Sequence, residues 1–131
     1  MLEVGAVAAD AQKERAIRLM AETLPLAGYG GVHADLPGWD RPEMIHGAMR
    51  DHRPALFCEQ PKPVFLDVLP LGPVTLEEVA SRWQLFSSAA ELTGGEFHVV
   101  IGRWVAGRDG RQVAKQVAEL VGVKIGYIWT I

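Results

Sequence analysis

The fold is decided by residues 62–70, KPVFLDVLP, an apolar run with a single carboxylate in its middle. Alternate side chains of a β-strand point to opposite faces of the sheet. In this run both faces are almost entirely apolar, which is typical of a central strand that is covered on both sides. The two faces are Val64, Leu66 and Val68 on one side and Phe65, Asp67 and Leu69 on the other.

Asp67 is the exception in this apolar strand. Burying a carboxylate is costly unless the group is paired, hydrogen-bonded, protonated or bound to a metal, so we expect it to have a partner. A metal shared with other acids would satisfy Asp67, and so would a buried ion pair with Arg53 or Arg82. The other charged residues considered are Glu14, Asp51, Glu59, Arg50 and Lys62. The identity of the partner decides the function, and the sequence leaves these alternatives open.

Composition bounds the class of protein. The chain has 131 residues, 49% of them hydrophobic and 22% charged, which is ordinary for one globular domain spanning 1–131. The formal net charge of −3 gives no overall attraction to nucleic acid, so DNA binding has to be argued from a local site. The single cysteine, Cys58, excludes an internal disulfide, and we expect a buried structural thiol. Without a transmembrane run or a signal peptide, we expect a cytoplasmic protein with no membrane partner.

Hydrophobic periodicity and capping residues predict the secondary structure. Thr75 and Glu78 form a capping box at the start of one helix, and Gly94 ends that helix. Two apolar runs separated by residues 59–62 predict an antiparallel hairpin. The expected elements are, in order, a helix at 10–24, a short strand near 31–34, hairpin strands at 52–58 and 63–69, a helix at 75–94, a strand at 97–101, a helix at 109–122 and a strand at 124–131. This order predicts an α/β domain with a mixed central sheet of four to five strands flanked by helices.

Two further expectations concern the helix faces and the long connection at 28–47. The inward residues of the two later helices are predicted to be Val79, Trp83, Phe86 and Ala90, and then Val113, Ala114, Val117, Leu120 and Val121. Connections as long as 28–47 are usually functional or partly structured in a compact domain. The residues of interest in it are Trp39, Arg41 and His46.

The element order and the acidic residues resemble those of the PD-(D/E)xK nuclease superfamily, the restriction-endonuclease-like fold that includes Holliday-junction resolvases. Residues 50–51, Arg-Asp, stand where that family has Pro-Asp, and residues 67–69, Asp-Val-Leu, stand where it has (Asp/Glu)-x-Lys. The resemblance implies a restriction-endonuclease-like fold, DNA as substrate and Mg²⁺ as cofactor. It also implies that Asp51 and Asp67 are catalytic metal ligands and that Glu14 is a third ligand.

Metal chemistry explains the family pattern, and this chain departs from it at Leu69. In the family, two carboxylates hold Mg²⁺, the metal lowers the pKa of a bound water, and the lysine orients or deprotonates that water. Leu69 replaces the lysine, and an apolar side chain cannot activate water. Lys62 lies on the same hairpin but at the edge of its strand. Gln84 stands where several members carry a glutamine on the following helix.

Two functions therefore remain open. The first is a diverged nuclease-like domain that acts on DNA, a metal-dependent endonuclease whose degenerate site at Asp51 and Asp67 leaves catalysis impaired or absent. The alternative is a non-catalytic α/β protein-interaction or assembly domain, in which Asp67 is a neutralised relic. The surface beside the hairpin distinguishes them, since phosphate binding needs Lys or Arg there and a protein interface favours apolar and aromatic groups.

The C-terminal segment also predicts self-association. Residues 124–131 alternate as in a strand and are rich in Ile, Tyr and Trp. An apolar strand of this kind at a sheet edge invites pairing with another chain. We therefore expect a homodimer.

Overall fold

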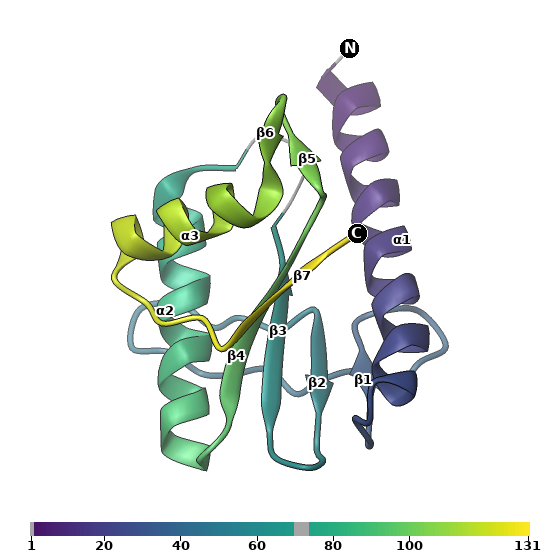
Figure 1. Ribbon diagram of the computed structural model, residues 1–131, viewed down its shortest axis with the longest axis vertical. Helices are drawn as coiled ribbons and strands as arrows, with labels where there is room; N and C mark the ends of the chain where they lie inside the picture. Colours follow the sequence, from purple (N-terminus) through teal and green to yellow (C-terminus); the bar gives the residue numbers. More distant parts are fainter. Residues whose placement is uncertain (1, 70–73) are drawn as a thin grey trace.

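The computed structural model describes residues 2–69 and 74–131, which are arranged in three layers (Figure 1). Helix α1 covers one face of a five-stranded sheet, and α2 and α3 pack against the other face. The elements are α1 (Leu2–Leu26), β1 (His33–Ala34), β2 (Leu56–Cys58), β3 (Val64–Val68), α2 (Leu76–Thr93), β4 (Glu96–Ile101), β5 (Trp104–Val105), β6 (Arg108–Asp109), α3 (Gly110–Val121) and β7 (Tyr127–Thr130).

Strand β3 lies in the middle of the sheet, whose order is β1-β2-β3-β4-β7. Strands β1, β2 and β3 pair antiparallel, whereas β3, β4 and β7 run parallel. The parallel register places Asp67 beside Val99 of β4. The predicted class, an α/β domain with a mixed sheet flanked by helices, is confirmed.

Both faces of β3 are buried, as the alternation of its residues predicts. One set of side chains packs under α1, and the other packs with α2 and α3. The set under α1 is Val64, Leu66 and Val68, and the opposite set includes Phe65 and Leu69. The core is therefore split into two apolar layers by the sheet, and Asp67 belongs to the layer shared with α2.

The ends of α2 and α3 follow the predicted caps. The Thr75 hydroxyl accepts the backbone N–H of Glu78 at 3.1 Å, so the helix begins where the capping box predicts. Gly94 ends α2 in the left-handed region at a φ of 69°, a conformation that suits glycine because it has no Cβ. Asp109 and Gly122 play the same two roles for α3. The buried residues of α2 are Val79, Trp83, Phe86 and Ala90, as predicted.

Four details differ from the sequence-based expectations. Helix α1 begins at Leu2 rather than at Asp10, because the residues before Asp10 are mostly good helix formers that extend it. Leu120 was predicted to face inward but is 70% exposed, since the buried stripe of α3 runs instead through Ala114, Ala118 and Val121. The β5–β6 hairpin was not predicted, and strand β7 is shorter than the range 124–131.

The long connection between β1 and β2 folds back over the hairpin. Ile45 and His52 exchange two backbone hydrogen bonds of 2.8 and 3.0 Å, which tie its two arms together. Pro42, within this connection, is buried. This segment therefore forms a fixed wall beside β2 and β3. Across the two described ranges, no helix has the length and apolarity needed to cross a membrane.

Candidate functional site

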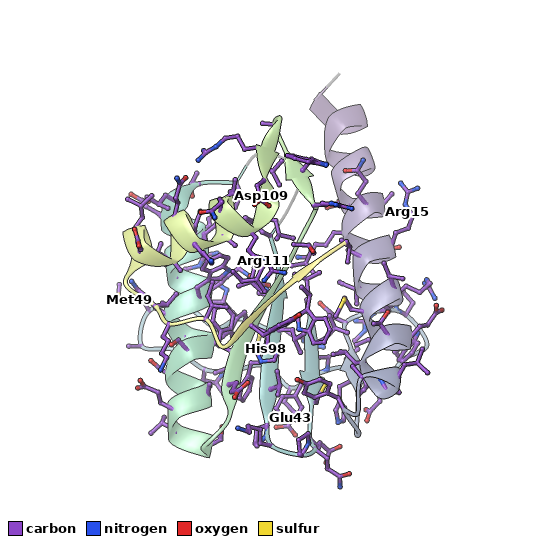
Figure 2. The ribbon with its side chains drawn as sticks, in the orientation of Figure 1. Arg15, Glu43, Met49, His98, Asp109 and Arg111 are labelled. Carbon is purple, nitrogen blue, oxygen red and sulfur yellow. The ribbon has the colours of Figure 1, made fainter. Side chains whose placement is uncertain are left out.

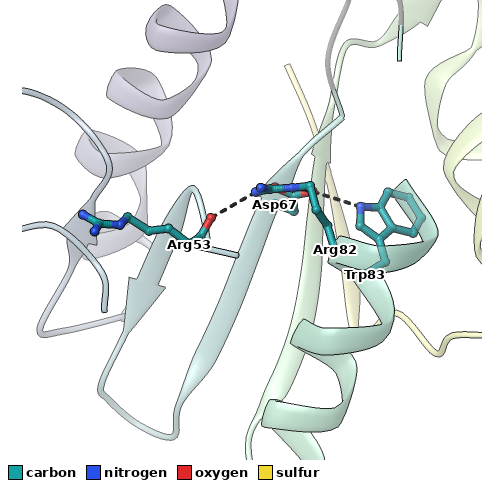
Figure 3. A network of polar contacts seen from close by, with 4 residues as sticks. All are labelled: Arg53, Asp67, Arg82 and Trp83. Atoms are coloured by element: carbon teal, nitrogen blue, oxygen red, sulfur yellow. Dashed lines mark hydrogen bonds and ion pairs between the residues drawn. The ribbon is translucent and has the colours of Figure 1, made fainter. Parts of the chain in front are cut away.

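Asp67 is buried and satisfied by two side chains of α2. Its relative exposure is 2%, and its Oδ1 accepts from Arg82 Nη2 at 2.6 Å while its Oδ2 accepts from Arg82 Nε at 3.2 Å (Figure 3). The indole Nε1–H of Trp83 donates to the same Oδ2 at 3.0 Å. Both carboxylate oxygens are therefore engaged by fixed protein donors, in the bidentate geometry that guanidinium favours.

Arg82 is itself held in place by two further contacts besides the carboxylate. Its Nη2 also donates to the backbone carbonyl of Arg53 at 3.1 Å, and its guanidinium lies 5.1 Å from the centre of the Phe86 ring. Burial alone would lower the pKa of Arg82, but the adjacent Asp67 carboxylate outweighs burial and raises it. Figure 3 shows the Arg53 side chain pointing away from Asp67, so Arg53 contributes its backbone and not its charge.

The position of this cluster follows from local sequence. Thr75 fixes where α2 begins, and the helical period then places Trp83 toward the sheet, where its exposed fraction is 0%. Arg82, the preceding residue, lies at the margin of the buried face with 24% of its side chain exposed. An arginine at this margin can reach a buried acid with its head while its stem covers apolar surface. The sequence left Arg53 and Arg82 open as partners, and the side chain of Arg82 forms the ion pair.

The other predicted site residues, Asp51 and Glu14, do not contact Asp67. Asp51 is exposed, accepts the backbone N–H of Gly47 at 3.2 Å, and lies 3.1 Å from His46 Nδ1. The hydrogen bond from His46 is the main reason that the pKa of Asp51 is lowered. Glu14 is exposed on α1, on the face of the sheet opposite to Asp67. The structure therefore does not bring Asp51, Asp67 and Glu14 into one cluster.

The remaining family positions also have structural roles. Leu69 is 9% exposed and packs in the apolar layer under α2. Gln84 donates to the backbone carbonyl of Val121 at 2.9 Å, which ties α2 to the end of α3. Lys62 pairs with Glu96 at 3.2 Å. These contacts use the side chains that the resemblance would assign to DNA chemistry.

The donors around Asp67 do not fit a Mg²⁺ ion. Magnesium takes an octahedral shell of oxygen ligands, usually from carboxylates and water. Here a permanent cation and an indole N–H occupy the carboxylate, and the backbone entering β2 beside it carries the buried apolar residues Pro54 and Ala55. Within residues 2–69 and 74–131, no group of three or more His, Cys, Asp or Glu side chains is arranged to hold a metal ion.

A groove beside the hairpin was not predicted as a site. It encloses about 790 Å³ between the long connection and strands β2 and β3. Its lining residues are His33, Asp40, Arg41, Pro42, Glu43, Met44, Ile45, His46, Pro54, Phe57, Glu59 and Phe65. The sequence signal was the length of the segment 28–47, which supplied Arg41 and His46 as residues of interest. Their joint site with β2 and β3 depends on the fold.

His33 organises the wall of this groove formed by β1. Its Nδ1 lies 3.0 Å from Asp40 Oδ2, and its Nε2 lies 2.9 Å from Glu59 Oε2. The imidazole ring also packs 5.8 Å from the Phe57 ring. His33 therefore joins β1, the connection after it and the end of β2 at one point of the groove.

Comparison of this chain with protein-family models, with curated proteins and with solved structures gives no match.

Proposed function

We propose that this chain is a diverged PD-(D/E)xK nuclease-like domain that has lost catalysis and acts by binding a partner protein. The observation that carries the proposal is the Asp67–Arg82 ion pair, which uses both carboxylate oxygens. In the nuclease mechanism the corresponding acid directs its oxygens to Mg²⁺. Arginine remains charged at any accessible pH, so it competes permanently with a metal for Asp67. The second part of the mechanism is the activation of water, and Leu69 does not supply the cation that this step needs.

The groove supports a protein partner over DNA. Its floor and walls contain aromatic and aliphatic side chains, including Phe57, Phe65 and Ile45. Three carboxylates, those of Asp40, Glu43 and Glu59, line the same groove as one arginine, so a phosphate backbone would be repelled there. The arginine that lines this groove is Arg41. Apolar and aromatic groups beside the hairpin are the pattern expected of a protein interface.

DNA binding without cleavage is the second candidate function. The segment that enters β2 carries Arg50 and Arg53, and the Arg53 backbone carbonyl contacts Arg82 of the ion pair. Arg82 keeps 24% of its side chain exposed. These cations could contact phosphates in a non-specific manner. Electrophoretic mobility assays with linear and branched DNA at two salt concentrations test this function separately from cleavage.

The proposal is tested by nuclease assays with Mg²⁺ and with Mn²⁺ on linear and branched DNA. The wild-type protein should not cleave, and calorimetric titration with Mg²⁺ should give no binding heat. Leu69→Lys supplies the missing ammonium and is the single substitution most able to create activity. We expect even this variant to remain inactive, because Arg82 still holds Asp67. The double variant, Leu69→Lys with Arg82→Gln, is therefore assayed beside it.

Two substitutions identify the source of any cleavage. Wild-type cleavage that is abolished by Asp67→Asn, with an unchanged circular dichroism spectrum, would overturn the loss of catalysis and keep the site. Cleavage that survives both Asp67→Asn and Asp51→Asn would rule out a site built on these two acids. Asp51 is exposed, so its substitution should leave the fold intact.

We also propose that the domain assembles as a homodimer through β7. This strand ends the sheet and pairs with β4 on its inner side. Tyr127 is 48% exposed and Ile131, just beyond the strand, is 42% exposed. Trp104 is 67% exposed and follows Arg103, whose backbone N–H donates to the Ile131 carbonyl at 2.9 Å. An edge strand with apolar neighbours of this size favours pairing with a second copy.

A further inference from the structure

We propose that the groove between the long connection and the β2–β3 hairpin binds a polypeptide segment of a partner that carries Lys or Arg beside an apolar side chain. This inference rests on the proposed function, because it names the chemistry of the partner protein. It is carried by three observations, which are an aromatic floor, a fixed wall and an excess of carboxylates at the rim.

The floor of the groove is formed by two neighbouring phenylalanines. The rings of Phe57 on β2 and Phe65 on β3 lie 4.9 Å apart at 50° to each other. Phe65 is 7% exposed, whereas Phe57 is half-buried and presents more of its ring to the groove. Helices α2 and α3 pack over the neighbouring part of this face and leave the two rings at the groove. An apolar, aromatic floor of this kind takes an aliphatic or aromatic side chain and also the stem of a Lys or Arg.

The wall is held in position by contacts on both of its arms. Ile45 is fixed by its paired backbone hydrogen bonds to His52. Arg41 Nε donates to the Leu36 carbonyl at 3.4 Å, and Arg41 lies 3.8 Å from Asp35, so its guanidinium is directed back toward the connection. A wall fixed in this way forms a site before a ligand arrives, which reduces the entropy lost on binding.

The rim selects the charge of the ligand. Asp40 and Glu59 contact His33, yet their side chains are 83% and 57% exposed, so both carboxylates remain within reach of a ligand. Glu43 lies near the hairpin on the same rim and is exposed (Figure 2). His46, also at the rim, is paired with Asp51 outside the groove. With Arg41 as the opposing cation, the carboxylates outnumber the permanent cations around the groove, and a cationic partner is favoured over an anionic one.

The test uses the full ¹⁵N-labelled chain and three synthetic hexapeptides, each acetylated and amidated. Their sequences are GLKLKG, GLQLQG and GLELEG, which differ only in charge. Two-dimensional NMR titrations should move the amide signals of Ile45, Phe57 and Phe65 on addition of the lysine peptide. The glutamine peptide should bind roughly fivefold to tenfold more weakly, because two exposed ion pairs are lost, and the glutamate peptide should not bind. Added salt should weaken the lysine peptide most.

Matched substitutions locate the binding. Glu43→Lys should abolish the preference for the lysine peptide, whereas Glu119→Lys, the same charge change at an exposed position of α3, should leave it unchanged. Phe57→Leu keeps the floor apolar but removes the ring, and should weaken all peptides that bind. Equal affinity for the three peptides, equal effects of the two glutamate substitutions, or signal changes confined to residues outside the groove would overturn the inference.

The outcomes for the groove and for the proposed function can be told apart. Absence of lysine-peptide binding together with a silent nuclease assay overturns the groove inference alone. DNA cleavage that depends on Asp67 overturns the proposed function. The groove inference is then still decided by the peptide titration. A short DNA duplex that moves the same groove signals as the lysine peptide would overturn the choice of a polypeptide.

Discussion

Arg82 binds both carboxylate oxygens of Asp67, at 2.6 Å from Nη2 and 3.2 Å from Nε, across the interface between α2 and β3. An acid in the middle of a covered strand is thereby neutralised without a metal. The pair also anchors α2 over the sheet, since the Trp83 indole joins it and the Arg53 backbone closes it on the far side. The contacts that satisfy the buried acid therefore also join α2 to the sheet.

The first prediction concerns this ion pair. Arg82→Met leaves Asp67 as a buried carboxylate without a cation, and should lower the free energy of unfolding by about 3 kcal/mol. Urea denaturation measures this change. Arg18→Met removes an exposed arginine from α1 and should change stability by less than about 0.5 kcal/mol.

The double variant gives the sharper result for the same pair. Because the Asp67→Leu and Arg82→Met substitutions remove both charges together, the double variant should be more stable than Arg82→Met alone. Strictly additive losses would show that the two residues do not act as a unit.

Trp83 is the subject of the second prediction. It is fully buried against Phe97, with ring centres 5.7 Å apart, and it donates to Asp67. Trp83→Ala should therefore lower the free energy of unfolding by about 3 to 5 kcal/mol, through lost packing and a lost hydrogen bond. Leu92→Ala on the same helix removes an 88% exposed side chain and is the control. A loss below about 1 kcal/mol for Trp83→Ala would contradict its buried position.

Local signals predicted much of this arrangement. The Thr75 cap and Gly94 fixed both ends of α2, so the helical period placed Trp83 inward, and alternation along β3 placed Asp67 on the same side. The partner of Asp67 depended on tertiary packing instead. Arg82 lies 15 residues away on another element, and nothing local separates it from Arg53. Leu120 shows the limit of an apolar pattern, because it is exposed while its neighbour Val121 is buried.

The groove could not be assembled from the sequence for a similar reason. Its floor comes from β2 and β3, its walls from β1 and from the connection after it, and its rim from that connection and from Glu59 just after β2. The length of the connection indicated that it was partly structured. The pairing of Ile45 with His52, which turns that connection into a wall, has no local sequence signal.

The third prediction concerns pH and begins with the geometry of His98. This residue is 1% exposed on β4, at the position labelled in Figure 2. Its Nδ1 accepts the indole N–H of Trp129 at 3.1 Å, so Nδ1 carries no proton and Nε2 donates to Glu96 Oε1 at 2.8 Å. Burial lowers the pKa of His98 more than the neighbouring Glu96 raises it, and the imidazole is neutral in the folded protein.

The sign of the pH effect follows from this lowered pKa. Above about pH 6.5, the ordinary pKa of histidine, the unfolded chain also leaves this group neutral and stability is unaffected by it. As the pH falls below that value, the unfolded chain gains a proton that folded His98 does not accept, so stability falls by up to about 1.4 kcal/mol per pH unit. His52, whose pKa burial also lowers, adds an effect in the same direction.

Urea unfolding between pH 7.5 and 5 measures this slope, an interval set by the ordinary pKa of about 6.5. His98→Gln should flatten it, whereas His46→Gln, at a side chain that is 79% exposed, should not. An unchanged slope in His98→Gln would mean that this imidazole is not the group that opposes protonation.

The last prediction concerns self-association through β7. If the exposed edge at Tyr127 and Ile131 pairs with a second copy, light scattering at micromolar concentration should give a dimer mass that falls on dilution. Tyr127→Lys places a charge on this edge, which is how natural sheets discourage pairing, and should give a monomer. Leu92→Lys adds the same charge at an exposed position of α2, far along the chain from the edge, and should leave the dimer intact. A monomer mass for the wild type at every concentration would remove the dimer, and equal dissociation by both lysine substitutions would move the interface away from β7.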